Sequence, residues 1–258
     1  MDESHADAAG WPAGTFAAGL TAGQRSDLLS RGVERRFDGG ATLMNQGDRG
    51  DSVAVLLRGV AKIWALSADG HETLLGLRTR GDLLGEMAVT ARVPRTARVV
   101  ASTPVLACVL TDREFRLYLD RWPGAAIEVA ATVARRLRTA NERRAEFRSR
   151  DAAQRVAAIL YDTAARVGQP VGAGRGGSSS SSSSSGTGGV SIGPEVTQGD
   201  LASLAAVALS TVERILQDFE RDGLVVRHRR ALILPDPAVL LERSGPGPGN
   251  PRHEGSRA

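Results

Sequence analysis

The chain has few cysteines, and the scarcity excludes several kinds of protein. Cys108 is the only cysteine among 258 residues, so an internal disulfide framework and a four-cysteine zinc or iron–sulfur site are excluded. It lies in the apolar run VLACVL, where we expect a buried thiol.

No stretch reaches the roughly 18–20 uncharged apolar residues that cross a bilayer. The acidic N-terminal segment MDESHADAAGWP has no apolar signal core. We therefore expect a cytoplasmic protein with no membrane contact.

Histidine is also scarce, and none of the four histidines has the neighbours that catalysis would need. His5 and His253 lie near the chain ends, His71 follows an Asp-Gly turn, and His228 lies between two short apolar runs. None is near a serine, cysteine or carboxylate arrangement suited to nucleophilic or metal chemistry. We expect no enzyme, no metal site and no cofactor.

Lysine is almost absent, although the chain is basic overall. The net charge is +4 and the pI about 10.1, but Lys62 is the only lysine and arginine supplies the rest. Such an excess of arginine over lysine, beside much alanine and glycine, is typical of a bias in the base composition of the genome, which acts on all proteins whatever their partners. Total arginine is therefore weak evidence for a nucleic-acid partner, and its placement is better evidence. A composition of 41% hydrophobic and 24% charged residues is ordinary for a globular chain long enough for two domains.

Short β-type runs dominate the first half of the chain. A capping box at Thr21 and Gln24 predicts a short helix that continues through LLSRGVERR. Glycine- and aspartate-containing turns then separate six runs, which predict a small all-β barrel or sandwich. The runs are ATLMNQ, VAVLLR, VAKIWAL, TLLGLR, TARVVAS and VLACVL.

Between the fourth and fifth runs lies GDLLGEMAVTARVPRTARV, which could hold a phosphodiester and a ribose. Glu86 can accept a hydrogen bond from a 2′-hydroxyl, Arg95 can fork onto two phosphate oxygens, and Thr96 can add a hydroxyl. Gly85 lets the backbone approach closely because it has no Cβ, and we include Met87 in the candidate site. This pattern suits a cyclic nucleotide. The alternative is a β-hairpin loop with a surface ion pair.

A long helix is predicted over residues 123–150. Apolar and small residues recur there at alternating steps of three and four, as in a coiled-coil seam, which predicts a dimer. The arginine- and glutamate-rich end of the helix is most simply a solvated face. The seam positions are Ile127, Ala130, Ala134, Leu137, Asn141 and Arg144.

The next segments alternate between order and low complexity. Asp151 is a candidate N-cap for a second helix, AAQRVAAILYDTAARV, which Gly168-Gln-Pro170 ends. Residues 172–189 contain eight consecutive serines and are expected to form a flexible loop. The terminal segments 1–15 and 244–258 are expected to be disordered.

A helix-turn-helix followed by a hairpin is predicted in the last part of the chain. Thr197 can cap a short helix, and a tight turn leads to LSTVERILQDFERDG, whose polar face can reach a DNA groove. Arg229 lies at the tip of the hairpin, where it could touch the DNA backbone as a wing. The alternative is a winged helix used only for protein contacts. The candidate DNA-binding residues are Thr197, Leu209, Ser210, Thr211, Glu213, Arg214 and Arg229.

Taken in order, these motifs resemble the Crp/Fnr family of bacterial transcription regulators. The resemblance runs from about Phe16 to Leu241 and is interrupted by the serine-rich loop. It is carried by TLMNQGDRGDSVAVLLRGVAKIW, by GDLLGEMAV with PRTARV, by ARRL and NERR, and by TQGDLASLAAVALSTVERIL. No single segment is specific to the family, but the occurrence of all of them in this order is highly specific.

The resemblance implies an α+β fold in which each part has a known role. It implies an N-terminal cyclic-nucleotide-binding β-roll of the double-stranded β-helix or jelly-roll type over 16–122, the dimerisation helix, and a winged helix-turn-helix over 151–243. It further implies a homodimer that binds a double-stranded DNA operator under control of cyclic AMP or a related nucleotide, with RNA polymerase as a candidate partner. Glu86 would hold the ribose, Arg95 and Thr96 the cyclic phosphate, and Asn141 the base.

The sequence departs from the family pattern at three places. Ala140-Asn141 replaces a pair of hydroxyl residues, and Asn141 also falls on the seam, where a buried asparagine can fix dimer register instead. Ala208-Leu209 replaces Ser-Arg, which removes a guanine-reading fork and a good N-cap. Thr90 replaces a common aromatic residue. A regulator that is ligand-independent or tuned to another effector, with Glu86 and Arg95 paired to each other, therefore stays open.

Overall fold

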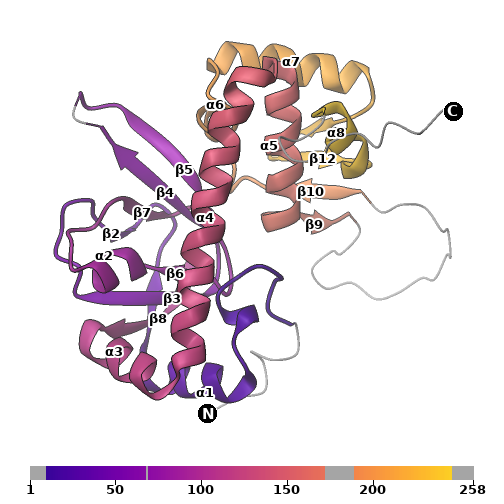
Figure 1. Ribbon diagram of the computed structural model, residues 1–258. Coiled ribbons are helices and arrows are strands. Elements are labelled where there is room, and N and C mark those ends of the chain that lie inside the picture. Colours follow the sequence, from indigo (N-terminus) through magenta and orange to yellow (C-terminus); the bar gives the residue numbers. More distant parts are fainter. Residues whose placement is uncertain (1–9, 68, 172–188, 246–258) are drawn as a thin grey trace, which may run out of the picture. The chain divides into compact units, whose positions relative to one another are not determined.

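The computed structural model describes residues 10–67, 69–171 and 189–245, which divide into two compact units (Figure 1). The first unit ends at Arg138 and the second begins at Thr139, within one helix. Most of the predicted serine-rich loop and most of the two predicted tails lie outside the described residues. None of the helices in these ranges is long and apolar enough to cross a membrane.

Two antiparallel four-stranded sheets form the centre of the first unit, with strand orders β1-β8-β3-β6 and β2-β7-β4-β5. All six predicted runs contain strands, which confirms the expected β-rich domain. The strands are β1 (Val33–Phe37), β2 (Thr42–Met44), β3 (Ser52–Arg58), β4 (Ala61–Leu66), β5 (Glu72–Arg78), β6 (Leu83–Leu84), β7 (Arg98–Ala101) and β8 (Val105–Thr111).

Strand β3 is buried on both faces and contributes to two apolar clusters. Val53 and Val55 pack in one cluster with residues of the helices, while Ala54 and Leu56 pack in the other with residues of the second sheet. This follows from the geometry of a strand, in which successive side chains point to opposite faces. The first cluster includes Val129 of the long helix, which therefore packs against the roll.

Helices surround the sheets of the first unit. The capping box at Thr21 and Gln24 is present, with Gln24 N donating to Thr21 Oγ1 over 3.3 Å and Thr21 N donating to Gln24 Oε1 over 2.8 Å. The long helix is a single unbroken element, as its pattern predicts. The helices are α1 (Ala22–Arg31), α2 (Glu86–Ala91), α3 (Asp112–Arg121) and α4 (Pro123–Ser149), preceded by the 3-10 turn η2 (Ala17–Gly19).

The predicted extent of the first helix is wrong, because VERRF forms strand β1. Helix α1 ends at Arg31, and β1 pairs with β8 from Val33 opposite Val109 to Phe37 opposite Val105. Gly32 makes the close approach possible, since a Cβ there would overlap Cys108 Sγ. The charged side chains of β1 point to solvent, so the strand has little apolar signal of its own.

The chain also becomes ordered earlier than its composition suggests. Trp11 lies beneath the Arg80 guanidinium, whose carbon is 4.3 Å from the ring centroid. Thr15 is buried and donates to Pro12 O over 2.7 Å, and Ala17 N donates to Gly81 O over 2.9 Å. Residues 10–15 thus pack against the loop that leads into β6, and the prediction of a disordered tail fails for them.

Asp27 connects helix α1 to the end of α3 and gives the first unit a testable pH dependence. Its carboxylate accepts from Arg31 Nε over 3.0 Å and from Trp122 Nε1 over 2.8 Å, and lies 3.8 Å from Arg121 Nε. The hydrogen bond from Arg31 is the largest of the influences that lower the pKa of Asp27. A lowered folded-state pKa stabilises the fold above the unfolded value of about 3.9, and this contribution is lost as pH falls through the folded value.

We therefore expect Asp27→Asn to lower the melting temperature of the first unit by a few degrees at pH 7. The difference from the wild type should shrink as pH falls below about 4 and vanish below the lowered pKa of the folded state, where the wild-type carboxylate is also neutral. All three tryptophans lie in the first unit, so tryptophan fluorescence follows its unfolding. A deficit that stays constant down to pH 2 would contradict the assigned role of the charge.

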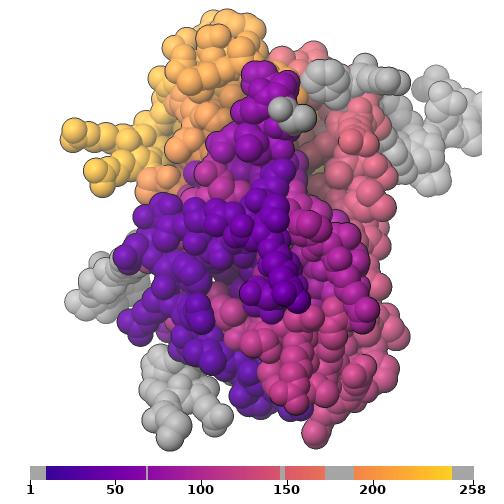
Figure 2. All heavy atoms as spheres, turned by 90° about the vertical axis from the view of Figure 1, so that its left-hand side faces the viewer, coloured from indigo at the N-terminus to yellow at the C-terminus, as the bar shows by residue number. Residues whose placement is uncertain are grey.

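The β4–β5 hairpin extends away from the body of the roll (Figure 2). Ala61 pairs with Arg78 at its base, and Leu66 pairs with Glu72 toward its tip. Arg98 Nη2 on β7 bonds to Glu72 Oε1 over 2.6 Å, which ties the hairpin to its neighbouring strand. The expected turn at Asp69-Gly70 is present, since Gly70 has a φ of 84°.

The second unit is a winged helix. Helix α5 begins with the predicted N-cap, because Asp151 Oδ1 accepts from Gln154 N over 2.8 Å. Two helices joined by a short turn follow, beside a sheet of order β11-β12-β10-β9. Strands β9 and β10 and helix α8 were not predicted. The elements are α5 (Ala152–Val167), β9 (Gln169–Pro170), β10 (Val190–Ile192), α6 (Gln198–Ala205), α7 (Leu209–Arg221), β11 (Val226–His228), β12 (Ala231–Leu234) and α8 (Pro237–Arg243).

The turn between α6 and α7 contains a strained residue. Ala206 has a φ of 50° and a ψ of 54°, a left-handed conformation that costs an L-residue about 1 kcal/mol or more. Because Ala206 is exposed, glycine would relieve the strain without leaving a cavity. We expect Ala206→Gly to raise the free energy of unfolding of the second unit by about 0.5–1 kcal/mol.

The matched control for Ala206→Gly is Ser203→Gly, inside α6, which should lower the same free energy by about 0.5 kcal/mol. Circular dichroism in urea is the measurement, because the second unit has no tryptophan and fluorescence would report only the first. A destabilised Ala206→Gly variant would show that the turn needs the alanine side chain.

Cys108 is buried, as expected. It is 1% exposed, and Sγ lies 3.5 Å from Leu29 O. Burial, with a smaller contribution from the charge of Glu34, raises the pKa of the Cys108 thiol to about 11. The thiol is therefore protonated at neutral pH.

Candidate ligand site and nucleic-acid interface

The candidate ligand site is built around a glycine in the left-handed conformation. Gly85 joins β6 to α2 and has a φ of 80°. A Cβ at this position would overlap Arg95 Nη1 and lie 3.0 Å from Ser52 O. Glycine is therefore required for both the backbone angle and the close approach of the arginine.

Arg95 is held at the centre of this site by backbone and hydroxyl oxygens. It is 6% exposed. Its Nη1 donates to Gly85 O over 3.0 Å, and its Nη2 donates to Ser52 O over 2.7 Å and to Ser52 Oγ over 3.1 Å. Asp51 Oδ1 lies 3.7 Å from Nη2. Burial lowers the pKa of Arg95, while the charges of Asp51, Glu86 and Asp48 act in the opposite direction.

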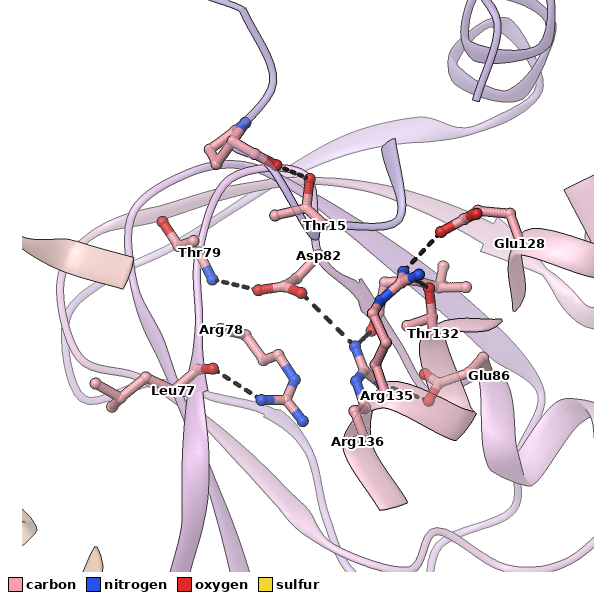
Figure 3. Close-up of polar contacts among 12 residues, drawn as sticks. Thr15, Leu77, Arg78, Thr79, Asp82, Glu86, Glu128, Thr132, Arg135 and Arg136 are labelled. Carbon is pink, nitrogen blue, oxygen red and sulfur yellow. Dashed lines mark hydrogen bonds and ion pairs between the residues drawn. The ribbon is translucent and has the colours of Figure 1, made fainter. Parts of the chain in front are cut away.

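Glu86 is buried and pairs with an arginine of the long helix. The residue is 2% exposed, and Arg136 Nη1 donates to its Oε1 over 2.5 Å. Arg136 Nη2 also donates to Leu83 O over 2.7 Å and lies 3.8 Å from Asp82 Oδ1 (Figure 3). The sequence raised two alternatives to a ligand site, a surface ion pair in a hairpin loop and a pairing of Glu86 with Arg95. The structure differs from both, because Glu86 and Arg95 are buried and Glu86 bonds to Arg136.

Arg136 was missed at the sequence level because it stands in a run of charges. The structure places it on the inner stripe of α4, which Ala125, Val129 and Thr132 bury against the roll. These three residues are spaced by four and three, and a further step of four reaches Arg136. The sequence therefore contained a sign that Arg136 lies on the buried side of the helix. Arg135 beside it makes a separate network, with Nη2 donating to Glu128 Oε1 over 2.6 Å and to Thr132 Oγ1 over 2.9 Å (Figure 3).

The remaining predicted ligand residues are more exposed. Met87 is 45% exposed, on the outer side of α2, and Thr96 is exposed directly after Arg95. Thr90 Oγ1 donates to Glu86 O over 2.7 Å and so satisfies a carbonyl of α2. Asn141 is exposed and belongs to the second unit. Within the first unit, the structure therefore brings together Gly85, Glu86 and Arg95.

The predicted seam of α4 is an exposed apolar stripe. Ile127 is 71% and Leu137 is 61% exposed. The small residues Ala130 and Ala134 lie exposed between them, and Asn141 follows one turn later. This stripe is distinct from the inner stripe that packs on the roll, so α4 presents one apolar face to the roll and a second to solvent.

Helix α7 divides sharply into a buried and an exposed face. Val212, Ile215, Leu216 and Phe219 are buried, whereas the predicted contact residues Leu209, Ser210, Glu213 and Arg214 are exposed. Thr211 is half-buried. Ala208 precedes the helix without a side-chain cap, as expected from its methyl group. Arg214 Nη1 lies 3.8 Å from Asp218 Oδ2.

Two further predicted contact residues, Thr197 and Arg229, lie outside α7. Thr197 caps α6, since its Oγ1 accepts from Asp200 N over 3.2 Å, and its hydroxyl also bonds to Asp200 Oδ2 over 2.8 Å. Arg229 is exposed at the turn between β11 and β12, with Arg230 beside it. Arg227 Nε lies 3.0 Å from Glu220 Oε2, which connects the hairpin to α7. The second unit thus exposes a polar helix face and a basic hairpin tip, both suited to DNA.

Comparison with known families agrees with this division of the chain. A model of the cyclic nucleotide-binding domain matches residues 34–121, and a model of the Crp-like helix-turn-helix domain matches residues 154–243. The first range contains the Gly85 site and the second contains α7 and the hairpin.

Individual relatives and solved structures are similar to the chain over about four fifths of its length. A CRP-like cAMP-activated global transcriptional regulator of Mycobacterium tuberculosis is 26% identical over 208 residues, which cover 81% of this chain and 86% of that protein. FixK2 of Bradyrhizobium japonicum has a similar fold, with a TM-score of 0.66 and 16% identity, covering 82% of this chain and 96% of the other. The c-di-GMP responsive regulator CLP of Xanthomonas campestris matches with a TM-score of 0.65 and 18% identity, covering 83% and 99%.

Proposed function

Because the chain belongs to the Crp/Fnr family of transcription regulators, we propose that it is a dimer whose affinity for a DNA operator is set by a cyclic nucleotide, with cyclic AMP as the first candidate. The observation that carries the proposal is the buried guanidinium of Arg95, which bonds to the carbonyl of Gly85, next in the chain to the buried carboxylate of Glu86. An arginine and a carboxylate presented in this way match an anionic phosphate next to a ribose hydroxyl.

The existing contacts leave capacity for a ligand. A guanidinium carries five N–H donors, and the three oxygens that Arg95 contacts do not exhaust them. The remaining donors would bond the cyclic phosphate, with the exposed Thr96 adding its hydroxyl. A carboxylate can accept about four hydrogen bonds, so Glu86 could accept the ribose 2′-hydroxyl while it keeps Arg136.

Control of DNA binding follows from the same contacts. Arg136 lies on α4, the helix that also carries the exposed stripe with Ile127 and Leu137. We propose that this stripe is the dimer contact and that the ligand favours one arrangement of the paired helices. DNA affinity then rises with occupancy, because the ligand stabilises the arrangement that it binds better. Asn141 would contact the base or fix dimer register.

The identity of the effector is the finer part of the proposal. The relative from Mycobacterium tuberculosis is described as cAMP-activated, and CLP is described as c-di-GMP responsive. Cyclic AMP is the better candidate here, because a compact site with one buried arginine and one buried carboxylate matches one phosphodiester and one ribose. Phosphate and ribose recognition rest on Gly85, Glu86, Arg95 and Thr96, with Met87 beside them.

The test is titration calorimetry with cyclic AMP, cyclic GMP and cyclic di-GMP, using protein whose dimeric state is established by sedimentation. We expect heat with cyclic AMP and tighter binding of a selected operator in its presence. Operator binding should weaken as salt rises, since arginine–phosphate contacts release counterions. No heat at millimolar cyclic AMP would contradict the effector, and no DNA binding at low salt would contradict the regulator.

A further inference from the structure

Leu209 is an unusual residue on the DNA-facing side of α7. It is 48% exposed, whereas the other large apolar side chains of this helix, Val212, Ile215, Leu216 and Phe219, are 3% exposed or less. Leu209 is the first residue of the helix, so its exposure does not come from fraying at a chain end. Its side chain is therefore not one of the buried core residues of the second unit.

The surroundings of Leu209 are polar. Ser210 is next to it, Glu213 lies one turn further on the same side, and Arg214 completes the exposed face. A single apolar side chain among hydrogen-bonding groups does not form the extended apolar patch that a protein partner would require. It does fit the major groove, where base edges present donors, acceptors and one apolar group, the C5-methyl of thymine.

The start of α7 is also suited to approach DNA closely. Ala208 provides no side-chain cap, so no capping side chain covers the amides at the start of the helix, which can donate to a phosphate. A phosphate held there would bring the adjacent Leu209 side chain to the edges of nearby bases.

We propose that Leu209 contacts the C5-methyl group of a thymine in each operator half-site. This inference rests on the proposed DNA-binding function and specifies one base pair of the site. A leucine cannot satisfy the donors and acceptors of any base edge, and a G·C pair offers no apolar group in exchange. Thymine instead buries its methyl group against the leucine.

The test uses an operator selected from random DNA and resynthesised with each thymine replaced in turn by deoxyuridine, which lacks only the methyl group. Fluorescence anisotropy measures the affinity of the wild type, Leu209→Ala and Leu209→Met for each duplex. We expect one thymine per half-site at which deoxyuridine weakens wild-type binding about 3- to 5-fold, the value of one buried methyl group. Leu209→Met should keep this dependence, and Leu209→Ala should lose most of it.

Each outcome bears on the inference separately from the function. Operator binding without any methyl effect that depends on residue 209 would overturn the Leu209 contact and leave the regulator intact. Equal methyl effects in the wild type and Leu209→Ala, as expected if Leu209 contacts a protein, would also overturn it. Absence of operator binding would overturn both. A second variant, Leu209→Arg, should shift the selected base toward guanine.

Discussion

Replacing Arg95 with alanine is expected to weaken effector binding by at least about 100-fold, because two charge-assisted hydrogen bonds to the phosphate would be lost. The same change leaves Gly85 O and the oxygens of Ser52 without their donor, so we also expect a loss of about 1–3 kcal/mol in the stability of the first unit. Calorimetry with cyclic AMP measures the first effect, and fluorescence in urea measures the second.

Two controls separate recognition of the phosphate from general damage at Arg95. Arg95→Lys keeps the charge but not the planar fork, so it should bind the effector with intermediate affinity. Arg98→Ala removes a half-exposed arginine bonded to Glu72 on the neighbouring hairpin and should leave effector affinity unchanged. If Arg95→Ala binds cyclic AMP as tightly as the wild type while folded, the ligand site is elsewhere.

Replacing Arg136 with alanine is expected to destabilise the first unit by about 3 kcal/mol, because it leaves the buried carboxylate of Glu86 without its partner. The double variant Arg136→Ala with Glu86→Gln removes the unpaired charge and should recover part of this loss. The coupling free energy of the resulting double-mutant cycle, from tryptophan fluorescence in urea, measures the pair directly.

The neighbouring residue provides the comparison for Arg136. Arg135 bonds to Glu128, and their side chains are 35% and 17% exposed. Arg135→Ala should therefore cost less, about 1 kcal/mol or below. If Arg135→Ala and Arg136→Ala lower the free energy of unfolding by the same amount, the contact of Arg136 with Glu86 does not stabilise the first unit more than an ordinary, partly exposed ion pair.

Much of the fold could be predicted from sequence because its signals are local. The capping residues Thr21, Asp151 and Thr197 mark helix starts within three residues of their partners. Short β-type runs between glycine- and aspartate-containing turns mark six of the strands. The unbroken three-and-four spacing marks α4. Each of these depends on neighbours along the chain, and each is confirmed.

The elements that escaped prediction depend on distant partners. Strand β1 carries charged residues and is held by β8, whose paired residues lie 68 to 76 positions away along the chain. Strands β9 and β10 are separated by the serine-rich segment and pair only through tertiary structure. Strand β1 is mostly charged, and β9 and β10 are only two and three residues long, so none of them has the longer apolar run that identifies a strand from sequence.

The same reason explains what was missed in the candidate ligand site. Gly85, Glu86 and Arg95 stand within one segment, and their types suggest their chemistry. Ser52 and Arg136 come from β3 and α4 and are recognisable only when those elements pack around the turn. For Arg136, the buried stripe of α4 was a usable signal that the charge run concealed.

The buried thiol of Cys108 makes the two units convenient to label. With its pKa raised to about 11 and its side chain shielded, Cys108 should not react with a maleimide dye at neutral pH. A cysteine introduced at an exposed position of each unit, such as Arg49 and Glu242, would then accept dyes in an otherwise native chain. Energy transfer between the dyes would follow the separation of the units as effector and operator are added.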